Sequence, residues 1–257
     1  MKKSDDIFAL IQKEVDKLGH IPTKDELDRI VARVTDQVNN TSLSDAEGLS
    51  PNQLQELLYS LFSERSPVRL NDGIHDEMAL KSPMTKLCQA LMLEIEQAGE
   101  LKLTNLVKVR NKKISLTAKG KKLLNTPGKL LTELFVAFCL KFNWGYFDGY
   151  SSENAAQFGV GYSLLLLHTY GKIQRKSDFY SKRVIEAIPL VLNEFYGSDF
   201  RTQEEEFASC YEIRLFHRGL DWFGLVEAKK ASRKYMQTGY SDIKTTSLFY
   251  DFIQINL

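Results

Sequence analysis

The stretch LKLTNLVKVRNKKISLTAKGKKLL, residues 101–124, changes its pattern twice along its length. Apolar and polar residues alternate through LKLT, LVKVR and KISLT, as in strands that bury one face. The polar run of Asn111, Lys112 and Lys113 predicts a turn between the last two strands. The segment AKGKKLL that follows predicts the start of a helix. We therefore expect residues 101–124 to form a β-hairpin followed by a helix.

This pattern is typical of the wing of a winged-helix domain, because strand, polar turn and strand lead into a helix through Leu-Thr and Lys-Gly. The C-terminal region repeats the plan. A long helix is predicted over residues 204–223 and ends at Gly224. A strand over 225–230, a polar stretch, and a strand passing into a helix over 243–253 follow it. The expected fold class is mainly α, a helical protein with small winged-helix-like β-hairpins.

The region before residue 50 predicts two amphipathic helices separated at Gly19. Thr23 and Glu26 have the spacing of a capping box at the start of the second helix. The polar run NNTSLSDAEGLS then predicts a linker, and Pro51 opens the next helix in its first turn. The expected domains are an N-terminal helical segment and linker (1–48), a helical region with the first hairpin (49–128), and a helical domain that ends in the second winged-helix-like module (129–257).

Composition and charge predict a cytoplasmic protein. The chain has 257 residues, 43% of them hydrophobic, and a formal net charge of +1. Residues 1–10 contain two acids and lack the apolar run of a secretory signal, and the longest apolar run, 162–167, is too short for a membrane span. Cys88, Cys139 and Cys210 are widely separated, which predicts buried thiols and neither a disulfide framework nor structural zinc.

Five segments together resemble an uncharacterised bacterial protein family over residues 49–227: ELLYSLFSERSPVRL, GELKLT, KISLTAKGKKLL, KFNWGYFDGY and RLFHRGLDWFGLVE. The resemblance implies helical proteins with winged-helix-like parts, and it brings no established activity or catalytic residues. In that family a further helical segment lies between GELKLT and LVKVR, where this chain has only Asn105. In a complete winged helix this interval holds the helix that enters the major groove. We therefore expect the first module to keep a wing and to lack a reading helix.

The most unusual charge feature is the absence of any acidic residue from 101 to 132. A cationic hairpin and helix can follow phosphates, which gives affinity without sequence reading. The alternatives are a solvated lysine-rich surface, a patch paired with acidic segments of the same chain, and a patch for an acidic protein partner. The candidate nucleic-acid or anionic-partner binding residues are Lys108, Arg110, Lys112, Lys113, Lys119, Lys121 and Lys122, with Lys229, Lys230, Arg233 and Lys234 in the second predicted wing.

The segment KFNWGYFDGY, residues 141–150, contains five aromatic side chains. Such a cluster can be a stacking platform for bases, a ligand pocket or a corner of the core. Lys141 is the only basic residue nearby, which argues against base stacking. We favour the core corner, with Phe142, Trp144 and Phe147 buried. The residues of the alternative pocket are Trp144, Tyr146, Asp148, Tyr150, His217 and Asp221.

His217 and Asp221 lie four residues apart on the predicted long helix, so they can share a face as an oriented general base. The plain alternative is a salt-bridge network with Arg214 and Arg218. The four histidines form no metal constellation and the glycines form no nucleotide-binding motif, so neither a metal nor a cofactor is expected.

We expect a non-enzymatic binding or accessory protein, with sequence-nonspecific contact to nucleic acid through the basic hairpin as the leading hypothesis. No membrane partner is expected. A protein–protein interaction or scaffold subunit, and an enzyme centred on His217 and Asp221, are the alternatives. The sequence leaves the target, the pathway and the oligomeric state open.

Overall fold

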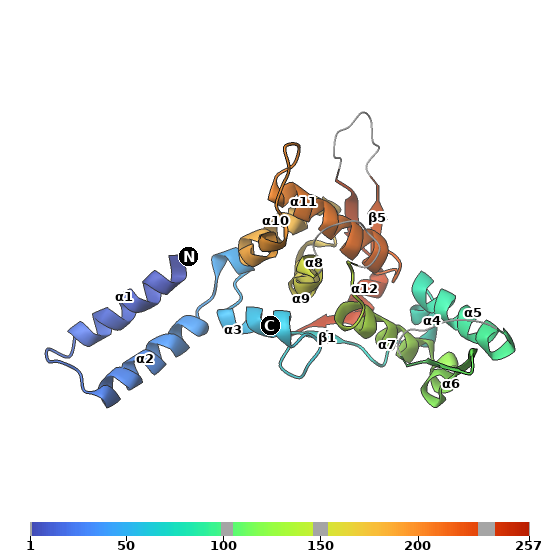
Figure 1. The fold of residues 1–257 in the computed structure, drawn as a ribbon, viewed down its shortest axis with the longest axis horizontal. Helices are drawn as coiled ribbons and strands as arrows, with labels where there is room; N and C mark the ends of the chain where they lie inside the picture. The colour runs from blue at the N-terminus through green and yellow to red at the C-terminus, as the bar shows by residue number, and fades with distance from the viewer. Residues whose placement is uncertain (1, 99–104, 146–153, 231–239, 257) are drawn as a thin grey trace. The chain divides into compact units, whose positions relative to one another are not determined.

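The computed structural model describes residues 2–98, 105–145, 154–230 and 240–256 (Figure 1). The chain is mainly helical and carries small antiparallel sheets, which confirms the predicted fold class. Its internal contacts divide it into two compact units, Met1–Glu56 and Leu57–Leu257. Within the described part of the chain, no helix combines the length and the apolar composition needed to cross a membrane.

The first unit is built on two helices, α1 (Lys2–Asp16) and α2 (Lys24–Asn39), which pack against each other. The chain leaves α1 through Gly19 at a φ of 68°, a conformation that glycine adopts without strain. The predicted capping box is present, since the Thr23 side chain accepts from the Glu26 N–H and the Glu26 side chain accepts from the Thr23 N–H. The linker contains a short 3₁₀ turn, η1 (Ser44–Ala46), and α3 (Pro51–Tyr59) begins at its proline as predicted.

The first strand of the second unit, β1 (Val68–Leu70), pairs with β7 (Ile253–Ile255). The predicted hairpin follows, with β2 (Val107–Arg110) antiparallel to β3 (Lys113–Leu116). Residues 101–104, the first predicted strand, lie outside the described residues. The helices of this region are α4 (Asp76–Ala79), α5 (Pro83–Ala98), α6 (Ala118–Leu124) and α7 (Pro127–Leu140).

The C-terminal part combines helices with a three-stranded sheet. Its strands are β4 (Arg175–Lys176), β5 (Val226–Lys229) and β6 (Asp242–Thr245), and β6 pairs antiparallel with both others. The helical elements are α8 (Ala155–Phe158), α9 (Val160–Tyr170), α10 (Ser177–Ala187), η2 (Pro189–Glu194), α11 (Gln203–Tyr211), η3 (Glu212–Leu220) and α12 (Ser247–Phe252). The alternation in the sequence predicted β5 and β6, whereas the two-residue strand β4 carries too short a pattern to be recognised.

The predicted long helix changes type at its middle. The first half, α11, is α-helical, and η3 is a π-helix, in which each N–H bonds to the carbonyl five residues earlier. The N–H of Asp221 continues this ladder, because it donates to the carbonyl of Phe216 with 3.0 Å between nitrogen and oxygen. A sequence pattern built on the α-helical period cannot anticipate this change.

The core of the second unit lies around α7, α9 and the α11–η3 helix. Every residue of α9 from Val160 to Leu167 is buried. The ring of Phe135 on α7 packs edge-on against Phe223 and Phe252, with centroids 5.1 and 5.5 Å away. Edge-to-face packing of this kind stabilises aromatic cores beyond the area it buries.

Candidate functional site

The β2–β3 hairpin has one apolar face and one basic face. Antiparallel pairing sets Val107 opposite Leu116 and Val109 opposite Ile114, so these four side chains share a face. The alternate positions pair Lys108 with Ser115 and Arg110 with Lys113 on the other face. All the basic side chains of the hairpin are exposed to solvent.

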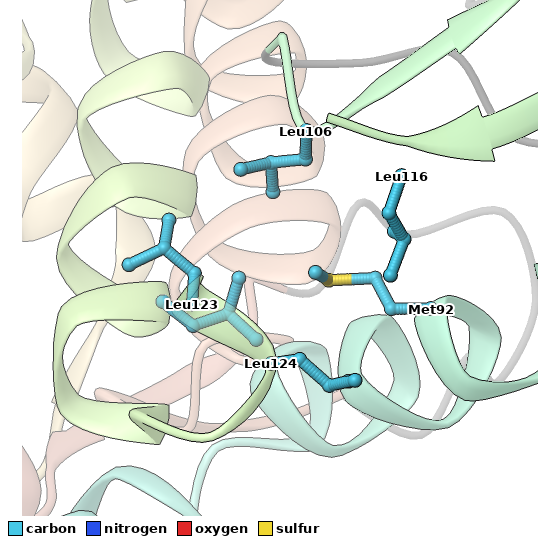
Figure 2. Close-up of a cluster of buried hydrophobic side chains, with 6 residues drawn as sticks. Met92, Leu106, Leu116, Leu123 and Leu124 are labelled. Atoms are coloured by element: carbon cyan, nitrogen blue, oxygen red, sulfur yellow. The ribbon is translucent and has the colours of Figure 1, made fainter. Parts of the chain in front are cut away.

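A buried leucine cluster fixes the hairpin to the helices around it (Figure 2). Leu106 and Leu116, at the root of the hairpin, are buried against Met92 of α5 and against Leu123 and Leu124 of α6. Each of these side chains is removed from water, and burying one of this size contributes about 1.5–3 kcal/mol. The basic face is therefore presented by a fixed scaffold.

Helix α6 lies directly against the root of the hairpin. A Cβ at Gly120 would stand 2.2 Å from the carbonyl oxygen of Leu106, so the close approach requires glycine at this position. The Thr117 side chain caps α6 by accepting from the Gly120 N–H at 3.0 Å. The Lys-Gly of the predicted helix start thus has a packing role.

The turn of the hairpin contains two residues, Asn111 and Lys112, at φ angles of 51° and 62°. Positive φ at both positions is the mark of a type I′ turn, which favours Asn followed by Gly. Lys112 holds the position that favours glycine, where an L-residue costs roughly 1–2 kcal/mol. Lys113, predicted to lie in the turn, is instead the first residue of β3, because the tight turn needs only two residues.

The helix α6 extends the basic surface of the hairpin. Lys119 and Lys122 are exposed, and Lys119 forms an ion pair with Glu133 of α7 at 2.6 Å. Lys121 is also exposed and has an electrostatic or hydrogen-bonding partner of its own. The structure therefore gathers Lys108, Arg110, Lys112, Lys113, Lys119, Lys121 and Lys122 on the hairpin and the helix that packs against it.

The second predicted wing is only partly described. Lys229 and Lys230 are exposed at the end of β5, and Nζ of Lys229 lies 3.8 Å from Oε2 of Glu227. Arg233 and Lys234 lie outside the described residues. The α11–η3 helix that precedes this wing exposes only Gln203, Glu204, Glu205 and Arg218. A mostly buried helix with an acidic start is unsuited to a DNA groove.

Trp144 anchors the aromatic corner. It is 3% exposed, its indole Nε1–H donates to the carbonyl of Phe138 at 2.7 Å, and its ring stacks on Phe138 at 4.7 Å. Gln157 of α8 fastens the same corner, because its amide donates to the carbonyls of Cys139 and Phe142 at 2.9 and 2.7 Å. No pattern in the sequence indicates this role of Gln157. The burial of Trp144 agrees with a core corner.

The other predicted members of the aromatic corner do not share the burial of Trp144 or lie outside the described residues. Phe142 is 37% exposed, so the prediction that it belongs to the core is wrong. The reason is that α7 ends at Leu140 and the chain turns, which moves Phe142 away from the apolar stripe of the helix. Tyr146, Phe147, Asp148 and Tyr150 lie outside the described residues.

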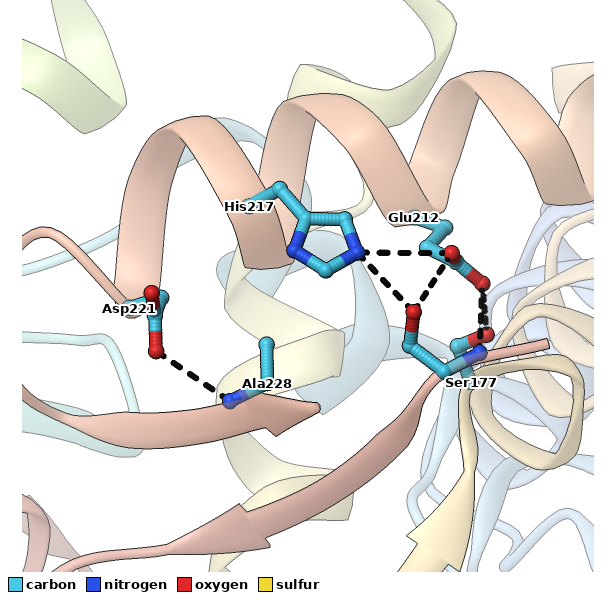
Figure 3. Close-up of polar contacts among 6 residues, drawn as sticks. Ser177, Glu212, His217, Asp221 and Ala228 are labelled. Carbon is cyan, nitrogen blue, oxygen red and sulfur yellow. Dashed lines mark hydrogen bonds and ion pairs between the residues drawn. The ribbon is translucent and has the colours of Figure 1, made fainter. Parts of the chain in front are cut away.

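His217 and Asp221 do not form the expected pair, as Figure 3 shows. Asp221 accepts from the backbone N–H of Ala228 at 3.1 Å. His217 Nε2 instead lies 2.9 Å from Ser241 Oγ and 3.4 Å from Glu212 Oε1. In a π-helix, side chains five residues apart lie closer to one face than in an α-helix, so His217 can meet Glu212. Asp221 follows the last residue of η3, and its carboxylate binds the Ala228 N–H instead.

Glu212 is the centre of a polar network between three elements. Its carboxylate accepts from the hydroxyl of Ser177 at the start of α10, and from the hydroxyl and N–H of Ser241 beside β6 at 2.8 and 3.1 Å. Burial by itself would raise the pKa of Glu212, but the hydrogen bonds from His217, Ser177 and Ser241 outweigh it and lower the pKa to about 2. Glu212 is therefore ionised at neutral pH.

This network lacks the arrangement of a catalytic triad. In a triad the histidine takes the serine proton on one ring nitrogen while the acid binds the other. Here Ser241 donates its proton to Glu212 and so accepts from His217 Nε2, and the acid contacts the same nitrogen. With a pKa of about 2, Glu212 is also a weak base at neutral pH. The arrangement ties α10, η3 and β6 together.

Among the described residues, no group of three histidine, cysteine, aspartate or glutamate side chains is arranged to hold a metal ion. None of the three cysteines forms a disulfide; Cys139 and Cys210 are buried and Cys88 is half-buried. No protein-family model, curated protein or solved structure matches the chain. The residues themselves therefore carry the functional argument.

Proposed function

We propose that the basic surface of β2, β3 and α6 binds the phosphate backbone of nucleic acids without reading their sequence. One observation carries the proposal. The hairpin sets Arg110 opposite Lys113 and puts Lys112 at a φ of 62°, so that three cations meet at its tip.

Both features lower the stability of the free hairpin. Like charges directly opposite each other on neighbouring strands are destabilising, and a lysine in the left-handed region is strained where glycine is not. A surface needed only for solubility has no reason to combine these two costs at one turn. Sites that break local rules in this way are commonly functional. A bound polyanion would relieve the repulsion between Arg110 and Lys113.

Two features favour binding without sequence recognition. Helix α5 ends at Ala98 and β2 begins at Val107. Only eight residues, 99–106, separate the two elements in the sequence, an interval shorter than a helix of the mean length of about 11 residues, which favours binding through the hairpin without a separate reading helix. The α11–η3 helix, which holds the corresponding position before β5, is largely buried. Lysine and arginine contacts to phosphates carry no sequence information by themselves.

The test is a salt titration of binding to random duplex and single-stranded DNA. The variant replaces Lys108, Arg110, Lys112 and Lys113 by glutamine. The matched control makes the same change in net charge at exposed positions that do not belong to β2, β3 or α6: Lys13, Lys24, Arg29 and Lys81.

The wild type and the control should bind both DNAs and lose affinity steeply with salt, since phosphate contacts release counterions. The hairpin variant should lose affinity for all sequences alike. Its log–log salt slope on duplex should fall by up to about 3.6, at about 0.9 for each phosphate contact. No binding by the wild type at low salt would overturn the proposal and make an acidic protein the leading partner. A sharp preference for one duplex sequence would contradict the proposal that binding does not depend on sequence.

A further inference from the structure

The second unit contains a cavity that the basic hairpin does not explain. It has a volume of about 430 Å³ and lies between α5, the root of β2, α7 and η3. Protein interiors are close-packed, and few voids exceed the size of a water molecule. Small-molecule sites typically occupy about 300–1,000 Å³. A cavity of this size is thus suited to a ligand.

The inner wall of the cavity is apolar and adaptable. Met84 and Met92 of α5 line it together with Leu106 at the root of the hairpin. The stacked rings of Phe138 and Trp144 also line it. Methionine side chains are unbranched and polarisable, so they adjust to apolar ligands of different shape. The wall therefore suits a flexible hydrocarbon chain.

The open side of the cavity carries positive charge. The lining residues that are exposed to solvent are Leu87, Lys141, Phe142 and Arg218, and two of these are cations. Arg214, which is 1% exposed, adds a third cation to the lining, and Arg214 and Arg218 each have an interaction within the chain as well. No aspartate or glutamate occurs among the described lining residues. Guanidinium groups match carboxylates in charge and in planar geometry.

We propose that this cavity binds a single-chain amphiphile with a carboxylate head, such as a medium- or long-chain fatty acid. The hydrocarbon tail lies against Met84, Met92 and the Phe138–Trp144 stack. The carboxylate lies at the open side, where Lys141 and Arg218 meet it. This site is separate from the phosphate-binding surface proposed above, and either can fail without the other.

The experiment uses Trp144 as a reporter. Trp222 is the other tryptophan of the chain, 47% exposed, so Trp222→Phe leaves Trp144 as the only indole. Brominated dodecanoate, below its micellar concentration, should quench the fluorescence of Trp144 in this variant. Unlabelled decanoate, dodecanoate and tetradecanoate should displace it, and each added methylene should tighten binding by about fourfold until the cavity is full.

Removing the positive charges of Lys141 and Arg218 tests whether they bind the carboxylate of the ligand. The double variant Lys141→Gln and Arg218→Gln, in the Trp222→Phe background, should bind dodecanoate about tenfold or more weakly. Dodecanol should bind the double variant and its parent equally, because it has no charge to lose. A matched control, Lys81→Gln and Lys86→Gln, changes two exposed lysines outside the lining and should leave dodecanoate binding unchanged.

A second readout needs no substitution. Cys88 lines the cavity and is half-buried, whereas Cys139 and Cys210 are buried, so a thiol reagent should label Cys88 first. Dodecanoate should slow this labelling at the concentrations that quench Trp144. Absence of both quenching and protection would overturn the proposal. If dodecanol and dodecanoate bound equally well, and the double variant changed the affinity for neither, the proposal that Lys141 and Arg218 bind a carboxylate would be overturned.

Discussion

Glu212 and His217 lie five residues apart on a π-helix, and their side chains meet with 3.4 Å between Oε1 and Nε2. In an α-helix the favoured partners are three or four residues apart, so this pair depends on the π-helical geometry. The network that the pair forms with Ser177 and Ser241 holds β6 against the helix.

The lowered pKa of Glu212 predicts a dependence of stability on pH. The pKa is about 2 in the folded protein, against an ordinary value of 4.5. The stabilisation is therefore present above about pH 4.5 and is lost as the pH falls toward 2. At about 1.4 kcal/mol per pH unit, the full effect is up to about 3 kcal/mol.

Glu212→Gln should reduce the free energy of unfolding at pH 7 and flatten its decline between pH 5 and pH 2. Urea unfolding across this range measures both effects. Glu227→Gln, at an exposed position on β5, is the control and should change neither. If the free energy of unfolding depended on pH in the same way in Glu212→Gln as in the wild type, the lowered pKa of Glu212 would be contradicted.

The π-helix approaches Phe138 closely enough to require glycine at position 219. A Cβ there would stand 2.4 Å from Cζ of Phe138. Gly219→Ala should therefore lower the free energy of unfolding by about 1–3 kcal/mol, the range for overpacked cores. Gly73→Ala, where the added Cβ would lie at an ordinary 3.4 Å from Oδ1 of Asn71, should have little effect in the same thermal and denaturant measurements.

The hairpin turn predicts opposite changes in stability and binding. Lys112→Gly removes the strain of a left-handed lysine and should raise the free energy of unfolding by about 1 kcal/mol, after the flexibility of glycine is allowed for. It should also weaken DNA binding, since one cation is lost. Asn111→Gly keeps every charge and should leave binding unchanged. A Lys112→Gly protein that is less stable than the wild type would argue against the strain.

Trp144 predicts a large loss of stability on truncation. Trp144→Ala removes a buried ring, its stacking on Phe138 and its hydrogen bond, and should cost about 3–5 kcal/mol. Trp222→Ala, at a site 47% exposed, should cost much less. An unchanged melting temperature for Trp144→Ala would show that the corner contributes nothing to the core.

The elements that the sequence determined are those formed by near neighbours in the chain. The capping box of Thr23 and Glu26, the helix start at Pro51 and the β2–β3 pairing all follow from residues within a few positions of one another. Side-chain caps, proline and period-two alternation act at this short range, so a linear pattern contains the information. The charge of the basic surface was equally visible, because a run without acids has no acid of its own to neutralise it, although Glu133 from outside the run pairs with Lys119.

The other features of the fold and of the sites depend on the tertiary structure. Strand β4 exists because β6 supplies its hydrogen bonds, and Arg175 pairs with Ile243 from a distant part of the chain. The π-helix set Glu212, and not Asp221, beside His217, and the end of α7 turned Phe142 toward solvent. The cavity lining likewise joins residues of α5, α7 and η3. These features depend on packing between segments remote in sequence, where burial and long-range hydrogen bonds outweigh the weak local preference of each residue.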